Sequence, residues 1–156
     1  MKLDTVIDVS GFPGASKTHM RDALRAGFYD AGMLWWRKYR PRHFAMTAFA
    51  EYGYTKRNSR YTKWKMRHLR HSLPLVRTGR SRDLTQSKAI IATASYVHVR
   101  MSARVFNFKP KGFKGSMSKE MTTISSAEHQ AMTETVESTF AKVISRAPTR
   151  RRKQRV

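Results

Sequence analysis

The sequence predicts an α+β fold in which a small antiparallel sheet packs against a long N-terminal helix and a C-terminal helix, with projecting basic loops. Two helical patterns flank one run of alternating apolar and polar residues, and this order of signals is the basis of the prediction. With 156 residues, 40% of them apolar, the chain is long enough for one domain with a modest core. We expect an extended segment over residues 1–17, a single domain over residues 18–148 and a basic tail over residues 149–156.

The N-terminal quarter combines an extended segment with a long amphipathic helix. Residues 3–9 alternate loosely and indicate an extended segment or short strand, which a cluster of Gly and Pro at residues 11–14 closes. From residue 18 to about residue 39, apolar side chains recur at spacings of four and three, which predicts a helix with one apolar face. The members of this face are Met20, Leu24, Phe28, Ala31 and Trp35.

Three residues constrain this helix. Gly27 and Gly32 each cost a helix about 1 kcal/mol relative to alanine. We therefore expect a packed partner, or a close approach of another element, at these glycines. Pro41 lacks the N–H that would continue the helix and is expected to end or bend it.

The middle of the chain is dominated by charge, and its secondary structure is less clearly indicated. Residues 42–54 fit both a helical and a strand period, so both interpretations remain open. Residues 55–72 are so basic and polar that we expect little of them to be buried, and Asn58 with Ser59 indicates a turn. This segment predicts a projecting loop or hairpin followed by a short basic helix.

The sheet is predicted from one strongly alternating run. Between Tyr96 and Ala103 apolar and polar residues alternate, which indicates a strand with one buried and one wet face. Residues 89–93 and 105–108 flank this run at hairpin distances, so we expect a three-stranded antiparallel meander. Residues 107–115, with Pro, Gly and several lysines, then predict a loop.

The last helix is predicted to begin at a capping box formed by Ser125 and Glu128. A continuous apolar stripe follows the box, and Pro148 ends the helix. The stripe consists of Met132, Val136, Phe140, Val143 and Ala147. Residues 149–156 form a basic tail that needs a partner to become ordered.

Positive charge is concentrated in one stretch of the chain. Fourteen of the residues from Arg37 to Arg82 are Lys or Arg, only Glu51 is acidic, and aromatic residues are interleaved. The whole chain carries a formal net charge of +22. A solvated face does not require this density, so we predict binding to phosphate or to an acidic protein surface. The candidate partner-binding residues are Arg57, Arg60, Lys63, Lys65, Arg67 and Arg70.

Motifs for catalysis, metals and nucleotides are weak. Residues 11–18 read GFPGASKT and look like a phosphate-binding loop, but that motif requires Gly where Ser16 stands. His68 and His71 lie among arginines without a nearby carboxylate, where a metal cation would be repelled. The ten carboxylates are scattered among 32 basic residues and offer no pair suited to acid–base catalysis. No sequence motif indicates an activated nucleophile. We expect no enzyme activity, no cofactor and no metal.

Cysteine usage and hydropathy add two further expectations. The chain has no Cys, which excludes disulfides and thiolate metal sites. No apolar run approaches the roughly 18 residues of a membrane span, and the first ten residues lack the pattern of a secretory signal. We expect a protein that is soluble and not exported by the usual route.

A P-L-x-x-T-G-R segment followed by a further arginine lies between the basic stretch and the predicted strands. Its residues are Pro74, Leu75, Thr78, Gly79, Arg80 and Arg82. Together with the aromatic end of the first helix and the capped last helix, this order of parts resembles the head–tail joining proteins of long-tailed bacteriophages, called tail-completion or neck proteins. The resemblance covers about residues 18–147. That family usually carries an apolar residue where Ser81 stands, a role that Leu84 would take here.

The resemblance implies a structural virion protein that is assembled in the host cytoplasm. Proteins of this family form a ring, commonly of six copies, between the portal-side connector and the tail tube, and no catalytic residues come with it. The implied partners are further copies of the chain, neighbouring connector and tail-tube or terminator proteins, and packaged DNA through non-specific contact, but not a membrane. Basic loops would dock on acidic surfaces of adjoining rings.

A basic RNA- or DNA-binding structural protein, such as a ribosomal protein, is the alternative. Small size, a large positive charge with interleaved aromatic residues, and a basic tail are typical of that class as well. A closed ring in solution would favour the first interpretation, whereas a monomer carrying nuclease-sensitive material would favour the second.

Overall fold

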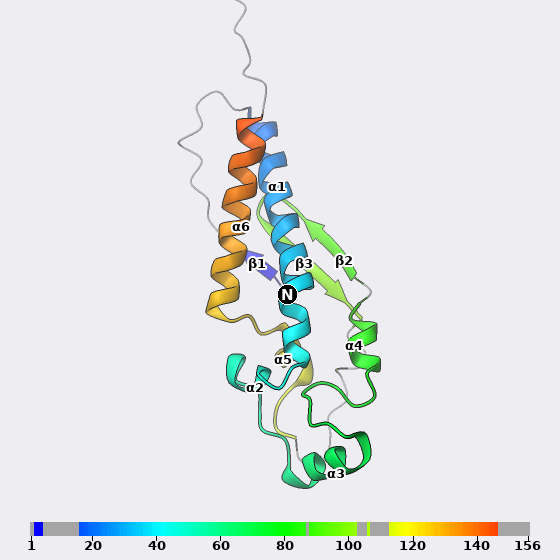
Figure 1. The fold of residues 1–156 in the computed structure, drawn as a ribbon. Coiled ribbons are helices and arrows are strands. Elements are labelled where there is room, and N and C mark those ends of the chain that lie inside the picture. Colours follow the sequence, from blue (N-terminus) through cyan, green and yellow to red (C-terminus); the bar gives the residue numbers. More distant parts are fainter. Residues whose placement is uncertain (1, 5–15, 87, 103–105, 107–112, 147–156) are drawn as a thin grey trace, which may run out of the picture.

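The computed structural model describes residues 2–4, 16–86, 88–102, 106 and 113–146, and for residues 2–4 it describes the backbone alone. Its two longest helices, α1 (Lys17–Leu34) and α6 (Ser126–Ser145), lie side by side at one end of an elongated molecule and run in opposite directions (Figure 1). A small antiparallel sheet packs against α1. The predicted α+β class, with a long N-terminal and a C-terminal helix, is confirmed. The shorter helices lie toward the other end: α2 (Ala48–Glu51), α3 (Ser59–Leu69), α4 (Arg80–Leu84) and α5 (Met117–Thr122).

The sheet has the strand order β1-β3-β2. Both outer strands, β1 (Lys2–Asp4) and β2 (Lys88–Ala92), pair antiparallel with the central strand β3 (Tyr96–Met101). Leu3 lies opposite Val97, so the first residues of the chain join a sheet whose other strands come more than eighty positions later. The prediction of a short N-terminal strand is thus confirmed for Lys2–Asp4, and the rest of that segment lies outside the described residues.

The central strand shows the predicted alternation. Val97 and Val99 are buried, whereas Arg100 is exposed. The expected third strand at residues 105–108 lies almost entirely outside the described residues, and the strand that flanks β3 on the side opposite β2 is β1. Of those residues only Phe106 is described, and it is buried in the main core cluster.

Two glycines let α1 pack closely on both of its neighbours. A Cβ atom at Gly27 would lie 2.8 Å from the carbonyl oxygen of Val136 in α6. A Cβ atom at Gly32 would lie 2.8 Å from Cγ2 of Val97 in β3. The predicted close approach at these glycines is confirmed, and it places α1 between α6 and the sheet.

The helical path changes its winding after α1. A π-helical turn, η1 (Trp35–Tyr39), leads into a 3₁₀ turn, η2 (Arg40–Phe44). Pro41 lies in this second turn, where the missing N–H cannot continue an α-helix. The chain therefore bends here, as predicted, and Trp35 becomes completely buried.

The start of α6 is fixed by the capping box, in which Ser125 and Glu128 each accept a hydrogen bond from the other's backbone N–H. Along the helix the buried stripe continues at a constant spacing of four to Ile144. The prediction that Val143 belongs to the stripe is wrong: this side chain is 37% exposed, because a step of three at that point turns it away from α1. Ala147 lies outside the described residues.

Residues 42–54, left open between helix and strand, contain the short helix α2 and an irregular segment with a buried polar network. Nδ1 of His43 and the hydroxyl of Tyr54 are 2.5 Å apart, and the ring of His43 stacks on that of Tyr52. The Tyr52 hydroxyl donates to Oε1 of Glu128, also at 2.5 Å. Glu128 therefore caps α6 and anchors this segment at the same time, and burial raises its pKa.

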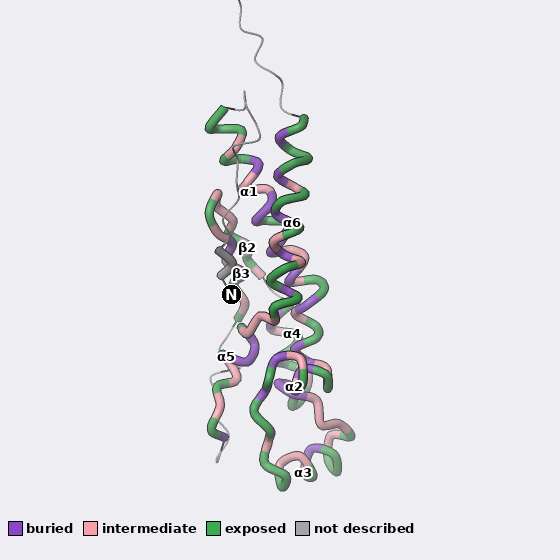
Figure 2. Tube along the Cα trace, turned by 90° about the vertical axis from the view of Figure 1, so that its left-hand side faces the viewer, coloured by how far each residue is buried: buried purple, intermediate pink, exposed green. Residues whose placement is uncertain are grey.

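The main core runs along the contact between α1, α6 and the sheet. In Figure 2 the buried positions of α1 and α6 alternate with exposed ones along each helix, as expected for two amphipathic helices. A smaller cluster near the ends of the two helices joins Ala23 to Phe140 and Ile144. No helix in the described part of the chain is both long enough and apolar enough to cross a membrane.

Candidate partner-binding surface

Most of the predicted partner-binding residues lie on α3, at the end of the molecule opposite the free ends of α1 and α6 (Figure 1). The turn expected at Asn58 and Ser59 is the start of this helix, because the Asn58 side chain accepts a hydrogen bond from the backbone N–H of Arg60. At the other end Arg70 closes the helix in the left-handed conformation, with φ of 59°. The basic helix is thus predicted correctly, although it occupies more of the segment than expected.

Four cations form one stripe on the outer side of α3. Their spacings of three, four and three place them within one face of the helix. All four side chains are exposed, and none has a carboxylate partner among the described residues. We call this set the cationic stripe; it consists of Arg60, Lys63, Arg67 and Arg70.

Lys65 was predicted to face a partner, and this prediction is wrong. Lys65 is only 5% exposed, and its Nζ donates hydrogen bonds to the carbonyl oxygens of Leu73 and Val76, each at 2.5 Å. On a helical wheel Lys65 lies about 180° from the middle of the cationic stripe, so its long side chain reaches inward. Burial, and to a smaller extent the charge of Arg57, lowers the pKa of Lys65 to about 8.

Arg57 has a structural role as well. Its guanidinium donates to both carboxylate oxygens of Glu120 in α5, at 2.9 and 2.5 Å, and the backbone N–H of Thr55 donates to the same carboxylate. The guanidinium also lies 4.4 Å from the ring centroid of Phe113. These contacts tie the chain that enters α3 to α5, and they leave Arg57 little surface for a partner.

Aromatic residues form a second stripe on α3, beside the cations. The rings of Tyr61 and Trp64 stack at 6.0 Å between centroids, and those of Trp64 and His68 stack at 5.1 Å. The guanidinium of Arg77 lies 5.5 Å from the Trp64 ring. The interleaving of aromatic and basic residues in the sequence therefore becomes two adjacent stripes on one helix.

The P-L-x-x-T-G-R segment forms the tight loop that supports α3. Pro74 is fully buried, and Leu75 is a buried residue with φ of +53°. Its carbonyl oxygen accepts a hydrogen bond from Oγ of Ser81 at 2.6 Å. Ser81 is buried, and this hydrogen bond satisfies its hydroxyl. Gly79, with φ of +85°, begins α4 in a conformation that favours glycine.

The remaining residues of this segment point outward. Thr78, Arg80 and Arg82 are exposed. The Arg82 backbone carbonyl and the Thr85 hydroxyl both accept hydrogen bonds from Arg40, which fastens α4 to η2. The segment thus combines a buried turn with additional surface cations next to α3.

The structure describes only residues 16–18 of the loop-like motif at residues 11–18, and it describes both histidines of the other weak motif. Ser16 is the N-cap of α1 and accepts a hydrogen bond from the backbone N–H of His19, while residues 11–15 lie outside the described part. The described residues contain no group of three or more His, Cys, Asp or Glu side chains that could hold a metal ion. His68 stacks on Trp64 instead.

Glu120 and the acceptors of Lys65 are the site residues that the sequence did not reveal. Glu120 lies more than sixty positions after Arg57, and no local pattern connects them. The acceptors of Lys65 are backbone carbonyl oxygens, which every residue has, so the amino-acid sequence does not indicate them. Comparisons of the chain with protein-family models, with curated proteins and with solved structures find no match.

Proposed function

We propose that this chain is a structural protein of the phage neck, which forms a ring and joins the DNA-filled head to the tail. In this proposal the cationic stripe of α3 docks on an acidic surface of an adjoining connector or tail protein. The support comes from the stripe itself and from the order of parts that resembles the neck proteins. Support for the ring and its copy number comes from the resemblance alone, and support for the docking surface comes from the exposure and charge of the cationic stripe.

The observation that carries the proposal is that the stripe is exposed and firmly held at the same time. Lys65 bonds α3 to the loop after it, and Arg57 bonds the chain before it to α5. Because both ends of the helix are fixed, its outer cations have a defined arrangement before a partner arrives. Such preorganisation lowers the entropy cost of association, and the charges speed and orient the encounter.

Nucleic-acid binding is the second candidate, and one observation favours it. The stacked side chains of Tyr61, Trp64 and His68 lie beside the cations, and aromatic side chains next to basic ones are typical of surfaces that bind single-stranded nucleic acid. However, these rings already stack on one another, and Arg77 lies against Trp64. Their faces are therefore partly occupied, and we favour the protein partner.

The test is a triple charge reversal on the cationic stripe: Arg60→Glu, Lys63→Glu and Arg67→Glu. The matched control reverses three exposed cations of α1 at the far end of the molecule: Lys17→Glu, Arg21→Glu and Arg25→Glu. We expect both proteins to melt within a few degrees of the wild type, because exposed charges contribute little to stability. Filled heads and finished tails should accumulate unjoined only with the stripe variant.

Two results would decide against the proposal. Normal joining by the stripe variant would mean that the stripe is an ordinary solvated face. If the wild type instead binds RNA or DNA tightly, and the stripe variant lowers the log–log salt slope by about one for each phosphate contact removed, the nucleic-acid function is correct.

A further inference from the structure

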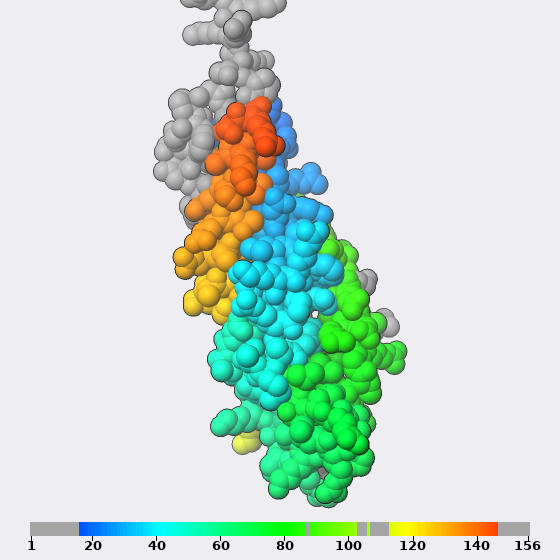
Figure 3. All heavy atoms as spheres, viewed as in Figure 1, coloured from blue at the N-terminus to red at the C-terminus, as the bar shows by residue number. Residues whose placement is uncertain are grey.

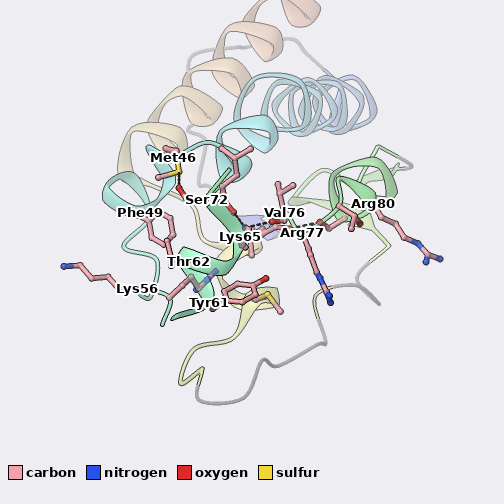
Figure 4. Close-up of a pocket in the computed structure, with 16 residues that line it drawn as sticks. Met46, Phe49, Lys56, Tyr61, Thr62, Lys65, Ser72, Val76, Arg77 and Arg80 are labelled. Atoms are coloured by element: carbon pink, nitrogen blue, oxygen red, sulfur yellow. Dashed lines mark hydrogen bonds between the residues drawn. The ribbon is translucent and has the colours of Figure 1, made fainter. Parts of the chain in front are cut away.

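A groove of about 510 Å³ lies on the side of α3 opposite the cationic stripe. One wall is formed by Tyr61, Thr62 and Lys65 of α3, and the others come from the loop after α3, the region of α2 and the start of α5. Figure 4 shows Lys65 near the middle of these residues, with Lys56 on one side and Arg80 on the other. In Figure 3 the α3 region forms the lower end of the molecule, opposite the free ends of α1 and α6.

The floor of the groove is apolar. Its backbone carbonyls are already satisfied from within the protein, because Lys65 donates to Leu73 and Val76 and Ser81 donates to Leu75. The floor therefore offers contact surface rather than hydrogen-bond acceptors to a ligand. The apolar lining comes from Met46, Phe49, Leu73, Leu75, Val76 and Met117, and Met46 is 50% exposed.

The rim of the groove is positively charged. Lys56, Arg77 and Arg80 are exposed and line it. Among the described residues that line the groove, none is Asp or Glu, and the nearby Glu120 is already paired with Arg57. A ligand that fits both parts needs an apolar group for the floor and carboxylates for the rim.

We propose that this groove binds an acidic segment of a partner protein. One or two large apolar side chains of the segment lie against the floor, and flanking Asp or Glu side chains pair with the rim cations. A nucleic-acid backbone would match the rim but would leave the apolar floor without contact, so its phosphates fit less well. The inference rests on the proposed function for the idea that the partner is a virion protein, but the binding itself is testable without it.

The experiment uses the whole purified chain and capped hexapeptides with two Glu residues on each side of a central pair. The central pair is Leu-Leu, Phe-Phe or Ser-Ser, so that the peptides differ in apolar surface and share their charge. We expect calorimetry to show one site for the Leu or Phe peptide, with an affinity at least tenfold higher than for the Ser peptide. Backbone amide shifts should cluster at Leu73, Val76 and Met117.

Variants of the chain locate the site. Met46→Asp, which places a carboxylate at the mouth of the groove, and Arg80→Glu, which reverses a rim charge, should each weaken binding of the apolar peptides at least tenfold. The matched control is Arg25→Glu, which reverses an exposed charge of α1 outside the cationic stripe and does not line the groove. This control should change the affinity less than threefold.

Three outcomes would overturn the inference. Equal affinity for all three peptides would show a charged patch without an apolar floor, and no binding by any of them would show that the groove is not a peptide site. Tighter binding of an eight-nucleotide poly-dT or poly-U strand, lost in the same variants, would assign the groove to nucleic acid. The stripe variant distinguishes this inference from the proposed function. If it fails to join heads to tails but binds the peptides normally, the two sites are separate. If it joins heads to tails normally but loses peptide binding, they are separate as well.

Discussion

At the scale of single residues, the partly buried Arg57 and the buried Lys65 hold α3 in place, and they use different acceptors. Arg57 pairs with a carboxylate, whereas the acceptors of Lys65 are two backbone carbonyls with no counter-charge. A buried ammonium of this kind is costly to desolvate, which is why its pKa falls to about 8. It is retained here because the tight loop after α3 would otherwise bury two carbonyl oxygens without a donor.

Lys65→Met tests this role. The substitution keeps an unbranched side chain that is one atom shorter and fully apolar, and it removes the donor to the carbonyl oxygens of Leu73 and Val76. We expect the free energy of unfolding, measured in urea, to fall by about 2 to 4 kcal/mol, because two buried acceptors lose their partner. The control is Lys63→Met on the exposed face of the same helix, which should change it by less than about 0.5 kcal/mol. Similar values for both variants would contradict the buried position of Lys65.

The buried His43 makes stability depend on pH. Burial lowers its pKa from 6.5 to about 4, against a smaller raising effect of the Glu120 backbone. Between these values the unfolded chain binds a proton that the folded chain does not, so stability falls as the pH decreases from 6.5 toward 4. The contribution of His43 to this loss should reach about 3 kcal/mol.

The measurement compares urea unfolding of the wild type and His43→Phe at pH 7 and at pH 4. The variant lacks the titrating ring and should lose less stability between the two pH values. His129→Phe, at an exposed position of α6, should retain the pH dependence of the wild type. An equal loss in the wild type and in His43→Phe would assign the acid sensitivity to other groups.

At the scale of secondary-structure elements, the close packing of α1 on α6 organises the fold. Gly27 allows the approach, and side chains of α6 at a spacing of four fill the contact. The spacing puts Phe140 at 2% exposure and leaves Val143 at 37%, although the two residues are only three positions apart. Neighbouring positions of one helix therefore make very different contributions to stability.

Phe140→Ala and Val143→Ala form a matched pair for this contact. Removal of the buried Phe140 ring should cost about 3 to 5 kcal/mol of unfolding free energy, because it leaves a cavity between α1 and α6. The same truncation at the exposed Val143 should cost less than about 1 kcal/mol. Both values come from thermal or urea unfolding. A larger loss at Val143 than at Phe140 would mean that α6 is rotated relative to the structure described here.

Elements defined by local pattern could be predicted from the sequence, and those defined by distant contacts could not. The capping box of Ser125 and Glu128 and the four-residue spacing fix α6 within one stretch of chain. By contrast, β1 pairs with β3 across more than ninety positions, and no local pattern indicates this pairing. The 105–108 segment lies at hairpin distance from β3, so the sequence favoured it as the third strand. On α3, spacing alone would separate Lys65 from the cationic stripe, but only once the helix boundaries are known.

At the scale of the whole molecule, charge is distributed very unequally. The helices α1 and α6 together carry four basic and five acidic residues, whereas residues 37–82 carry fourteen basic and one acidic. Since α3 lies opposite the free ends of α1 and α6, the positive charge of the described residues is concentrated toward one end of the molecule (Figure 1). Such an asymmetric charge orients a protein as it approaches an acidic surface. Composition alone indicated the positive charge, and the fold determines on which part of the molecule it lies.

This asymmetry predicts which end of the molecule is covered in an assembled particle. The chain contains no Cys, so Lys63→Cys on the cationic stripe and Glu137→Cys on α6 each introduce a single exposed thiol. In joined particles, the thiol at position 63 should react with a maleimide at least tenfold more slowly than in the free protein, because the partner covers it. The thiol at position 137 should react at nearly its free rate. Protection at position 137 with full reactivity at position 63 would mean that α1 and α6, and not α3, face the partner.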